Sequence, residues 1–232
     1  VCDIRGVGPG VWNNWKAVLL RTLFQLTMDS LSEGSTTLSK EGRVEQAKAT
    51  LVGMLEGWKA RDIKAECARH YDSYWIGLDA ATHKIFAELS VEVAEGQVNS
   101  SIEPDESRDA TRACFVMQDH PGIFARFAGA LALSGANVVD ARTYTSSDGL
   151  ATAVFWIQDG EGKPYEKSRL TRLRRMISQT LAGEVLTREA LKGKDKIKKR
   201  EKDFVVPTQI TFDNTGSDIH TIIEVDTRDR PG

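Results

Sequence analysis

The sequence has few of the features that mark specialised classes of protein. Its 232 residues include only three cysteines, with no C-x-x-C pair, so neither a disulfide framework nor a zinc knuckle is indicated. No apolar run approaches the roughly 18 residues that a membrane helix needs, and no signal-peptide pattern opens the chain. Lysine and arginine number 31 against 33 acidic residues, so no global field attracts nucleic acid. We therefore expect a cytoplasmic protein with no membrane and no nucleic-acid partner.

The composition is that of an ordinary globular protein. With 41% hydrophobic and 28% charged residues, the chain can build one large domain or two small ones. It begins at Val1 rather than at a methionine, which indicates a piece of a longer protein.

The first 94 residues have the apolar spacing of helices. Large apolar side chains recur every three or four residues over 12–31 and over 44–58, which predicts two helices with one buried stripe each. Shorter helices are expected to follow, one of them starting at an N-cap-like Asp79. Residues 95–110 are polar, lack an apolar period and predict a linker.

Beyond the linker, over 111–214, the spacing changes to a series of alternating segments. In chain order these are a strand at 113–118, a helix at 123–134, strands at 138–145 and 150–158, a helix at 170–181 and a strand at 208–213. The order βαββαβ is typical of a ferredoxin-like sandwich, in which two helices cover one face of an antiparallel sheet. The predicted fold class is α+β.

An internal repeat extends this reading. TRACFVMQDHPG at 111–122 and TIIEVDTRDRPG at 221–232 both run from a strand pattern into Asp-x-Pro-Gly, and their Pro-Gly pairs are 110 residues apart. A first strand alone cannot bury its face, so 218–232 is expected to start a second unit of the same kind.

The Asp-x-Pro-Gly joint predicts a ligand site. Pro121 fixes φ and Gly122 permits unusual backbone angles, so the chain can turn sharply from the sheet into a helix. The amides of Gly122, Ile123 and Phe124 are expected to lie unpaired at the positive end of that helix, where a carboxylate can bind. Valine at position 122 is expected to obstruct such a ligand and to restrict φ as well.

A purely structural explanation remains open for the same residues, in which Asp119 caps the helix and Pro-Gly makes a tight turn. The second copy at Asp229, Pro231 and Gly232 favours a binding site. In that case Asp119 or Asn137 would receive the ammonium or side-chain amide of the ligand. Asn137 is expected near the edge of the neighbouring unit rather than near its own Asp119, so that the ligand bridges two units.

Three other patterns fit structural roles better than functional ones. The glycines of GVGPG at 6–10 lack the βαβ unit that surrounds a nucleotide-binding loop. Cys67, His70 and His83 lack a fourth metal ligand, and both histidines are expected at the surface of helices. The basic run 187–204 contains scattered acids and almost no aromatic residues, which favours a solvated connection over a nucleic-acid site.

The segment after the linker resembles the ACT domain, the amino-acid-sensing module of many metabolic enzymes. The residues that carry the resemblance are D-x-P-G at 119–122, G-A-N at 135–137 and D-A-R-x-x-T at 140–145. The match covers about 111–214, and it implies a small ligand at the joint.

A closer resemblance covers nearly the whole chain. DIRGVGPGVWNNWKAVLL at 3–20, HYDSYWIGLDAATHKIFAEL at 70–89 and the paired ACT units are together similar to the bifunctional uridylyltransferase and uridylyl-removing enzymes that modify the nitrogen regulatory P-II protein. That family joins a nucleotidyltransferase domain, an HD-type phosphohydrolase domain and two terminal ACT domains. The resemblance implies P-II and UTP as partners, glutamine as effector, magnesium or manganese in the full-length enzyme, and a role in nitrogen assimilation.

The same resemblance divides the chain. It implies the helical end of the HD region over 1–94, a first ACT domain over 111–214 and the start of a second over 218–232. Asp3 would be a metal ligand whose partners lie upstream. No Gly-Ser followed by Asp-x-Asp and no His-Asp pair occurs, so this stretch alone is expected to be inactive and to bind no metal. The alternatives are a stand-alone amino-acid-binding ACT regulator and an HD/ACT guanosine-tetraphosphate synthetase-hydrolase.

Overall fold

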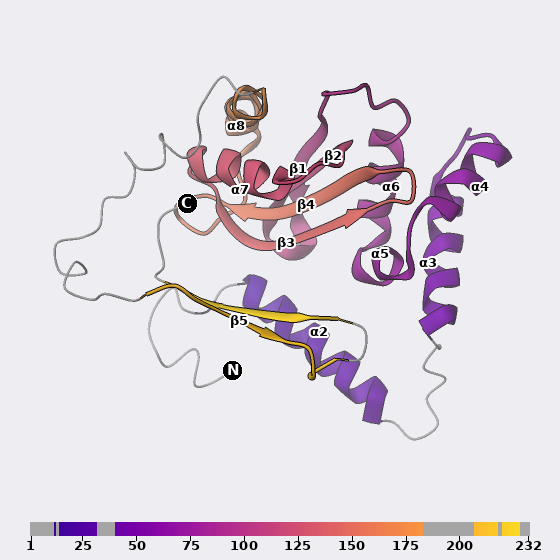
Figure 1. Cartoon of the computed structure of the whole chain (residues 1–232), viewed down its shortest axis with the longest axis horizontal. Helices are drawn as coiled ribbons and strands as arrows, with labels where there is room; N and C mark the ends of the chain where they lie inside the picture. Colours follow the sequence, from indigo (N-terminus) through magenta and orange to yellow (C-terminus); the bar gives the residue numbers. More distant parts are fainter. Residues whose placement is uncertain (1–11, 13, 32–39, 183–206, 218–219, 228–232) are drawn as a thin grey trace.

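The structure is a computed structural model. It describes residues 12, 14–31, 40–182, 207–217 and 220–227 (Figure 1). Asp3, the glycines at 6–10, the basic run 187–204 and the second Asp-x-Pro-Gly at 229–232 lie outside the described residues.

An antiparallel sheet of four strands forms the centre of the described chain. Its strand order is β1 (Asn99–Asp105), β2 (Ala110–Gln118), β4 (Leu150–Gln158) and β3 (Asn137–Thr145). The helices α7 (Ile123–Leu133) and α8 (Lys167–Leu181) cover one face, where Phe115, Phe127 and Phe155 meet in the core. The α+β prediction is confirmed, as are the two helices and three of the strands of the predicted sandwich.

The other face of the sheet is also covered, which differs from the expectation of helices on one face only. The helices α3 (Lys40–Met54), α5 (Asp72–Gly77) and α6 (Ala80–Leu89) pack there through Leu51, Trp75 and Phe86. With α4 (Ala60–Arg69) they form what we call the helical layer. All nine residues of β4 are buried as a result, because neither of its faces meets solvent.

An ion-pair network fastens the helical layer to the sheet. The buried guanidinium of Arg112 on β2 lies 2.6 Å from Glu103 on β1 and 3.5 Å from Asp79. Asp79 is also the N-cap of α6, as predicted, and accepts a hydrogen bond from the Thr82 amide. A single arginine on β2 therefore contacts both the neighbouring strand β1 and the start of α6.

The prediction that the whole of 95–110 is a linker without regular structure was wrong, because Asn99–Asp105 forms β1 and pairs with β2. Among its side chains, Ile102 is the one hydrophobic residue in the core. The strand is thus defined by its backbone pairing, which a search for apolar periodicity does not detect.

The strand predicted at 208–213 exists as β5 (Gln209–Asp213), but its expected place in the four-stranded sheet was wrong. It pairs instead with β6 (Ile222–Asp226), because β1 already occupies the free side of β2. Asn99 and Gln209, where β1 and β5 start, are 110 residues apart, as are the two Pro-Gly pairs. The spacing groups β5 with the second copy of the repeat, so that each copy begins with a hairpin.

Two details of the helical part also differ from expectation. The predicted buried stripe of α2 (Asn14–Leu31) is exposed at Leu19 and Leu23, because α2 contacts the short turn after β1 instead of joining the core of the helical layer. His70 and His83 are buried around Tyr74 rather than lying at the surface of helices.

Candidate functional site

The Asp-x-Pro-Gly joint lies where β2 ends and α7 begins. Gly122 is the N-cap of α7 and has a φ of 86°, a left-handed value that favours glycine. No side chain caps this helix, so the structural alternative, in which Asp119 is the cap, was wrong. The carboxylate of Asp119 instead accepts a hydrogen bond of 2.8 Å from Thr145 Oγ1 at the end of β3.

The start of α7 offers fewer free amides than expected. The Ile123 amide donates to the carbonyl of His120 at 3.3 Å, so it is engaged in the turn. The amides of Gly122 and Phe124 make no backbone hydrogen bond within the described part of the chain. A carboxylate at this helix start would therefore meet these two donors rather than Ile123.

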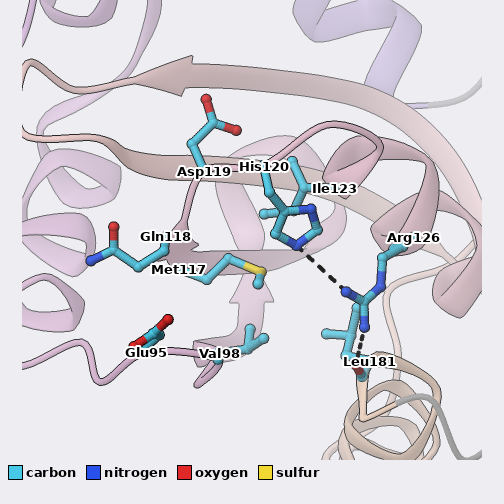
Figure 2. A pocket seen from close by; sticks show the side chains of 10 residues that line it. Glu95, Val98, Met117, Gln118, Asp119, His120, Ile123, Arg126 and Leu181 are labelled. Atoms are coloured by element: carbon cyan, nitrogen blue, oxygen red, sulfur yellow. Dashed lines mark hydrogen bonds between the residues drawn. The ribbon is translucent and has the colours of Figure 1, made fainter.

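A pocket of about 340 Å³ opens beside the joint (Figure 2). Its lining comes from the segment before β1, the end of β2, the first turn of α7 and the end of α8, and includes Glu95, Met117, Asp119, His120, Ile123 and Arg126. The side chains of Val98, Met117, Ile123 and Leu181 give it an apolar part, and those of Glu95, Gln118, Asp119, His120 and Arg126 carry polar groups.

The charged groups of this pocket are divided between its sides. Arg126 donates a hydrogen bond to the carbonyl of Leu181, and its other terminal nitrogen lies 3.5 Å from His120 Nε2. Figure 2 shows the Glu95 carboxylate on the far side of the pocket from Arg126. A guanidinium has five N–H donors, so Arg126 keeps donors for a ligand after these contacts. The pocket can thus bind an anionic and a cationic group at once.

The predicted site residues divide into three groups. Asp119 and Ile123 line the pocket, whereas Pro121 and Gly122 shape the joint without lining it. Asn137 begins β3 and pairs with Gln158, at the opposite end of β3 from Thr145 and its partner Asp119, so the fold does not bring it to this pocket. Sequence reasoning missed Glu95, His120 and Arg126.

The structure bears on the expected effect of valine at position 122. A Cβ atom on Gly122 would meet no protein atom within 4 Å, so it would enter the open space at the joint. A β-branched residue at a φ of 86° would also strain the backbone, so a loss of binding would have two causes. A substitution at Arg126 tests the site more directly.

The turn between β3 and β4, residues 146–149, joins this pocket to the helical layer. The carbonyl of Gly149 accepts a hydrogen bond of 2.9 Å from the Asp119 amide. On its other side, the Ser147 amide donates to the carbonyl of Arg69, and Asp148 forms an ion pair of 3.2 Å with the Arg69 side chain. One turn therefore contacts both the pocket wall and the end of α4.

The described ranges contain neither a membrane-spanning helix nor a metal-binding cluster. No helix there combines the length and the apolar character that a membrane crossing requires. No three histidine, cysteine or acidic side chains in the same ranges are grouped so that they could hold a metal ion.

Comparison with known families identifies the class of protein. The ACT domain family matches residues 114–167, the stretch from β2 to the start of α8 that carries the joint. The chain therefore contains an ACT domain.

Curated relatives give a more particular result. Bifunctional uridylyltransferase/uridylyl-removing enzymes from Cereibacter sphaeroides and Ruegeria pomeroyi are 62% and 61% identical over all of this chain, and that of Rhodospirillum rubrum is 36% identical over 99% of it. The chain is homologous, over its whole length, to part of these enzymes. It spans about a quarter of their length, 25%, 26% and 25% respectively. No solved structure matches it.

Proposed function

We propose that this chain is the glutamine-sensing regulatory part of an enzyme that attaches UMP to the nitrogen regulatory P-II protein and removes it. Two observations support the proposal: the relatives share their name and up to 62% identity with the whole chain, and an ACT domain lies within it. The similarity extends through the helical layer as well as the ACT domain, which favours an enzyme over a stand-alone ACT regulator.

The observation that carries the ligand assignment is the separation of charge in the pocket beside the joint. The α-carboxylate of an amino acid would bind Arg126. Glu95 would bind the ammonium group on the opposite side. The apolar lining suits the two methylene groups of glutamine, and Gln118 or Asp119 can meet its amide.

Binding there would reach the helical layer through the turn 146–149. A ligand that binds the Asp119 side chain changes the surroundings of the Asp119 amide, which donates a hydrogen bond to the carbonyl of Gly149. The same turn is attached to Arg69 at the end of α4. The relatives' phosphohydrolase function would be controlled by this contact, because the resemblance assigns residues 1–94 to the end of the HD region.

The rest of the proposal concerns the full-length enzyme. Uridylyl transfer would use UTP, with magnesium or manganese to neutralise phosphate charge, and P-II as acceptor in the cytoplasm. Asp3 would be one ligand of a metal in the HD region. Asp229, Pro231 and Gly232 would form a second joint that holds a ligand in the same way.

Calorimetry of the full-length gene product with glutamine tests the site. Replacing Arg126 with methionine keeps the length of the side chain and removes its charge, so glutamine binding should weaken at least about tenfold, equivalent to about 1.4 kcal/mol. Glu95→Gln should weaken it similarly by removing the partner of the ammonium group. Arg175→Met, on the exposed face of α8, is the matched control and should bind as the wild type does.

A second measurement separates the ligand site from the enzymatic function. Uridylylation of P-II and removal of UMP are measured with and without glutamine in the same variants. The proposed effector role requires Arg126→Met to retain both activities but to lose their response to glutamine. Unchanged glutamine affinity in a folded Arg126→Met protein would refute this site, and absence of both activities in the wild type would refute the enzyme assignment.

A further inference from the structure

A second pocket, of about 510 Å³, lies within the helical layer between α4 and α6. The side chains that give it its chemical character are Trp58, Asp62, Glu66, Arg69, Glu88 and Ser90. It shares no lining residue with the pocket at the joint, and Arg69 is the one residue of its lining that the proposed glutamine response uses.

Three of its lining residues carry buried polar atoms that lack a hydrogen-bond partner; one of these atoms, Arg69 Nη1, lies 3.2 Å from Glu66 Oε2 in an ion pair. The Ser90 side chain belongs to a residue that is only 5% exposed, and its hydroxyl oxygen makes no hydrogen bond. Glu66 is 2% exposed; its Oε1 lies 3.3 Å from His70 Nε2 but has no hydrogen bond. Buried polar groups without partners are costly and rare, so their presence in the wall of an open pocket points to a ligand that satisfies them.

The charge of the pocket favours a cation. Three carboxylates, those of Asp62, Glu66 and Glu88, face one guanidinium, that of Arg69. Arg69 is already shared between Glu66 at 3.2 Å and Asp148 on the turn 146–149, also at 3.2 Å.

The basic neighbours of the rim do not cancel this negative charge. Lys84 lies 3.8 Å from Glu88 and Arg61 lies 3.1 Å from Asp62, but these pairs are exposed to solvent and therefore weak. Because the carboxylates outnumber the one guanidinium in the wall, an anionic ligand would be repelled.

The remaining lining selects the kind of cation. The half-buried indole of Trp58 offers an aromatic surface, which attracts organic cations and packs against their hydrocarbon part. Since no cluster of metal-ligating side chains occurs in the described ranges, a bare metal ion fits poorly. We propose that this pocket binds a small aliphatic amine, whose ammonium group lies beside Glu66 and Ser90 and whose carbon chain lies along Trp58.

The geometry assigns a contact to each part of the ligand. One N–H bond of the ammonium group would be donated to Ser90 Oγ or Glu66 Oε1, which satisfies an atom that is otherwise unpaired. A second charged end, as in a diamine, would reach Asp62 or Glu88 at the rim, because these side chains are 42% and 55% exposed. A diamine should therefore bind more tightly than a monoamine of equal length.

The test uses 1,4-diaminobutane as the probe and the full-length gene product, with binding followed by calorimetry. We expect a dissociation constant below about 1 mM for the diamine and at least about tenfold weaker binding of n-butylamine. Butane-1,4-diol has the same length without charge and should not bind, and neither should succinate.

Variants locate the binding to this pocket. The double substitution Asp62→Asn with Glu88→Gln should weaken diamine binding at least about tenfold, and Ser90→Ala should weaken it several-fold. Glu161→Gln removes an exposed carboxylate on a distant turn and is the control. The Asn/Gln changes are at the surface, so urea unfolding should show a native-like midpoint. Equal binding of the diol and the diamine, undiminished binding by the double variant, or no diamine binding at about 10 mM would each overturn the proposal.

Discussion

Arg112 is the residue whose replacement should show most clearly how the helical layer is held to the sheet. Arg112→Met removes a guanidinium that lies 2.6 Å from Glu103 and 3.5 Å from Asp79. The same group donates to the Thr82 hydroxyl at 3.2 Å and lies 4.0 Å from the carboxylate of Asp105. Removing one partner of a fully buried ion pair costs about 3–5 kcal/mol. The actual cost depends on how well the remaining carboxylates can be solvated.

The exposure of these partners lowers that figure. The side chains of Glu103 and Asp79 are 44% and 40% exposed, so water can replace the guanidinium there. Asp105 is buried, but it keeps hydrogen bonds from Ser107 and from the indole of Trp156. We therefore expect Arg112→Met to lower the free energy of unfolding by about 2 kcal/mol at neutral pH, below the full cost of a buried pair.

The pH dependence of this loss gives an independent check. Burial opposes the ionisation of Asp105, yet the hydrogen bonds from Ser107 and Trp156, with the charges of Arg112 and Arg108, lower its pKa below the ordinary 3.8. A carboxyl with a lowered native pKa stabilises the fold above its unfolded pKa, and this stability is lost as the pH falls through the native value. The difference between wild type and Arg112→Met should therefore shrink below about pH 4.

Urea unfolding followed by tryptophan fluorescence measures both quantities. Arg172→Met, on the exposed face of α8, is the control and should change the free energy of unfolding by less than about 0.5 kcal/mol. The account of the network fails if Arg112→Met costs less than about 1 kcal/mol at neutral pH, or if the cost is equally large at about pH 3.

Three further outcomes follow from burial. Burial lowers the pKa of His83 below 6.5, so the unfolded chain takes up the proton at a higher pH than the native state does. The native state should therefore lose stability as the pH falls below 6.5. Urea unfolding at two pH values should show a smaller loss in His83→Gln. Phe127→Ala should cost about 3–5 kcal/mol in the same assay and Phe124→Ala about 1 kcal/mol, because the two rings are 0% and 44% exposed. Burial raises the pKa of both thiols, but Cys114 is buried and Cys67 is only partly so, and iodoacetamide should therefore label Cys67 before Cys114 in the native protein. Equal labelling of these two cysteines, detected by mass spectrometry, would contradict the packing of β2.

The elements with strong local signals could be predicted from the sequence. The helix α7 follows from the apolar spacing after Gly122 and ends before Gly135, and β3 and β4 follow from alternation around a turn. β1 could not be found in this way, since its sequence NSSIEPD is polar and its pairing with β2 supplies what its side chains lack. The pairing of β5 with β6 was missed for a related reason, because an alternating pattern predicts a strand but does not indicate which strand it pairs with.

The candidate site shows the same division. The Asp-x-Pro-Gly motif located the joint and two lining residues, Asp119 and Ile123. Arg126 lies three residues after Ile123, a spacing that places both on one side of α7, so helical geometry could have found it. Glu95 could not be found, because it reaches the pocket from a segment before β1 that was interpreted as a linker.

The turn 146–149 touches the pocket wall through Gly149 and the end of α4 through Ser147 and Asp148. A contact of this kind works in both directions, since linked equilibria are reciprocal. If bound glutamine changes the affinity of the helical layer for a second ligand by some factor, that ligand changes the affinity for glutamine by the same factor. The glutamine concentration to which the protein responds would then depend on what else the protein has bound.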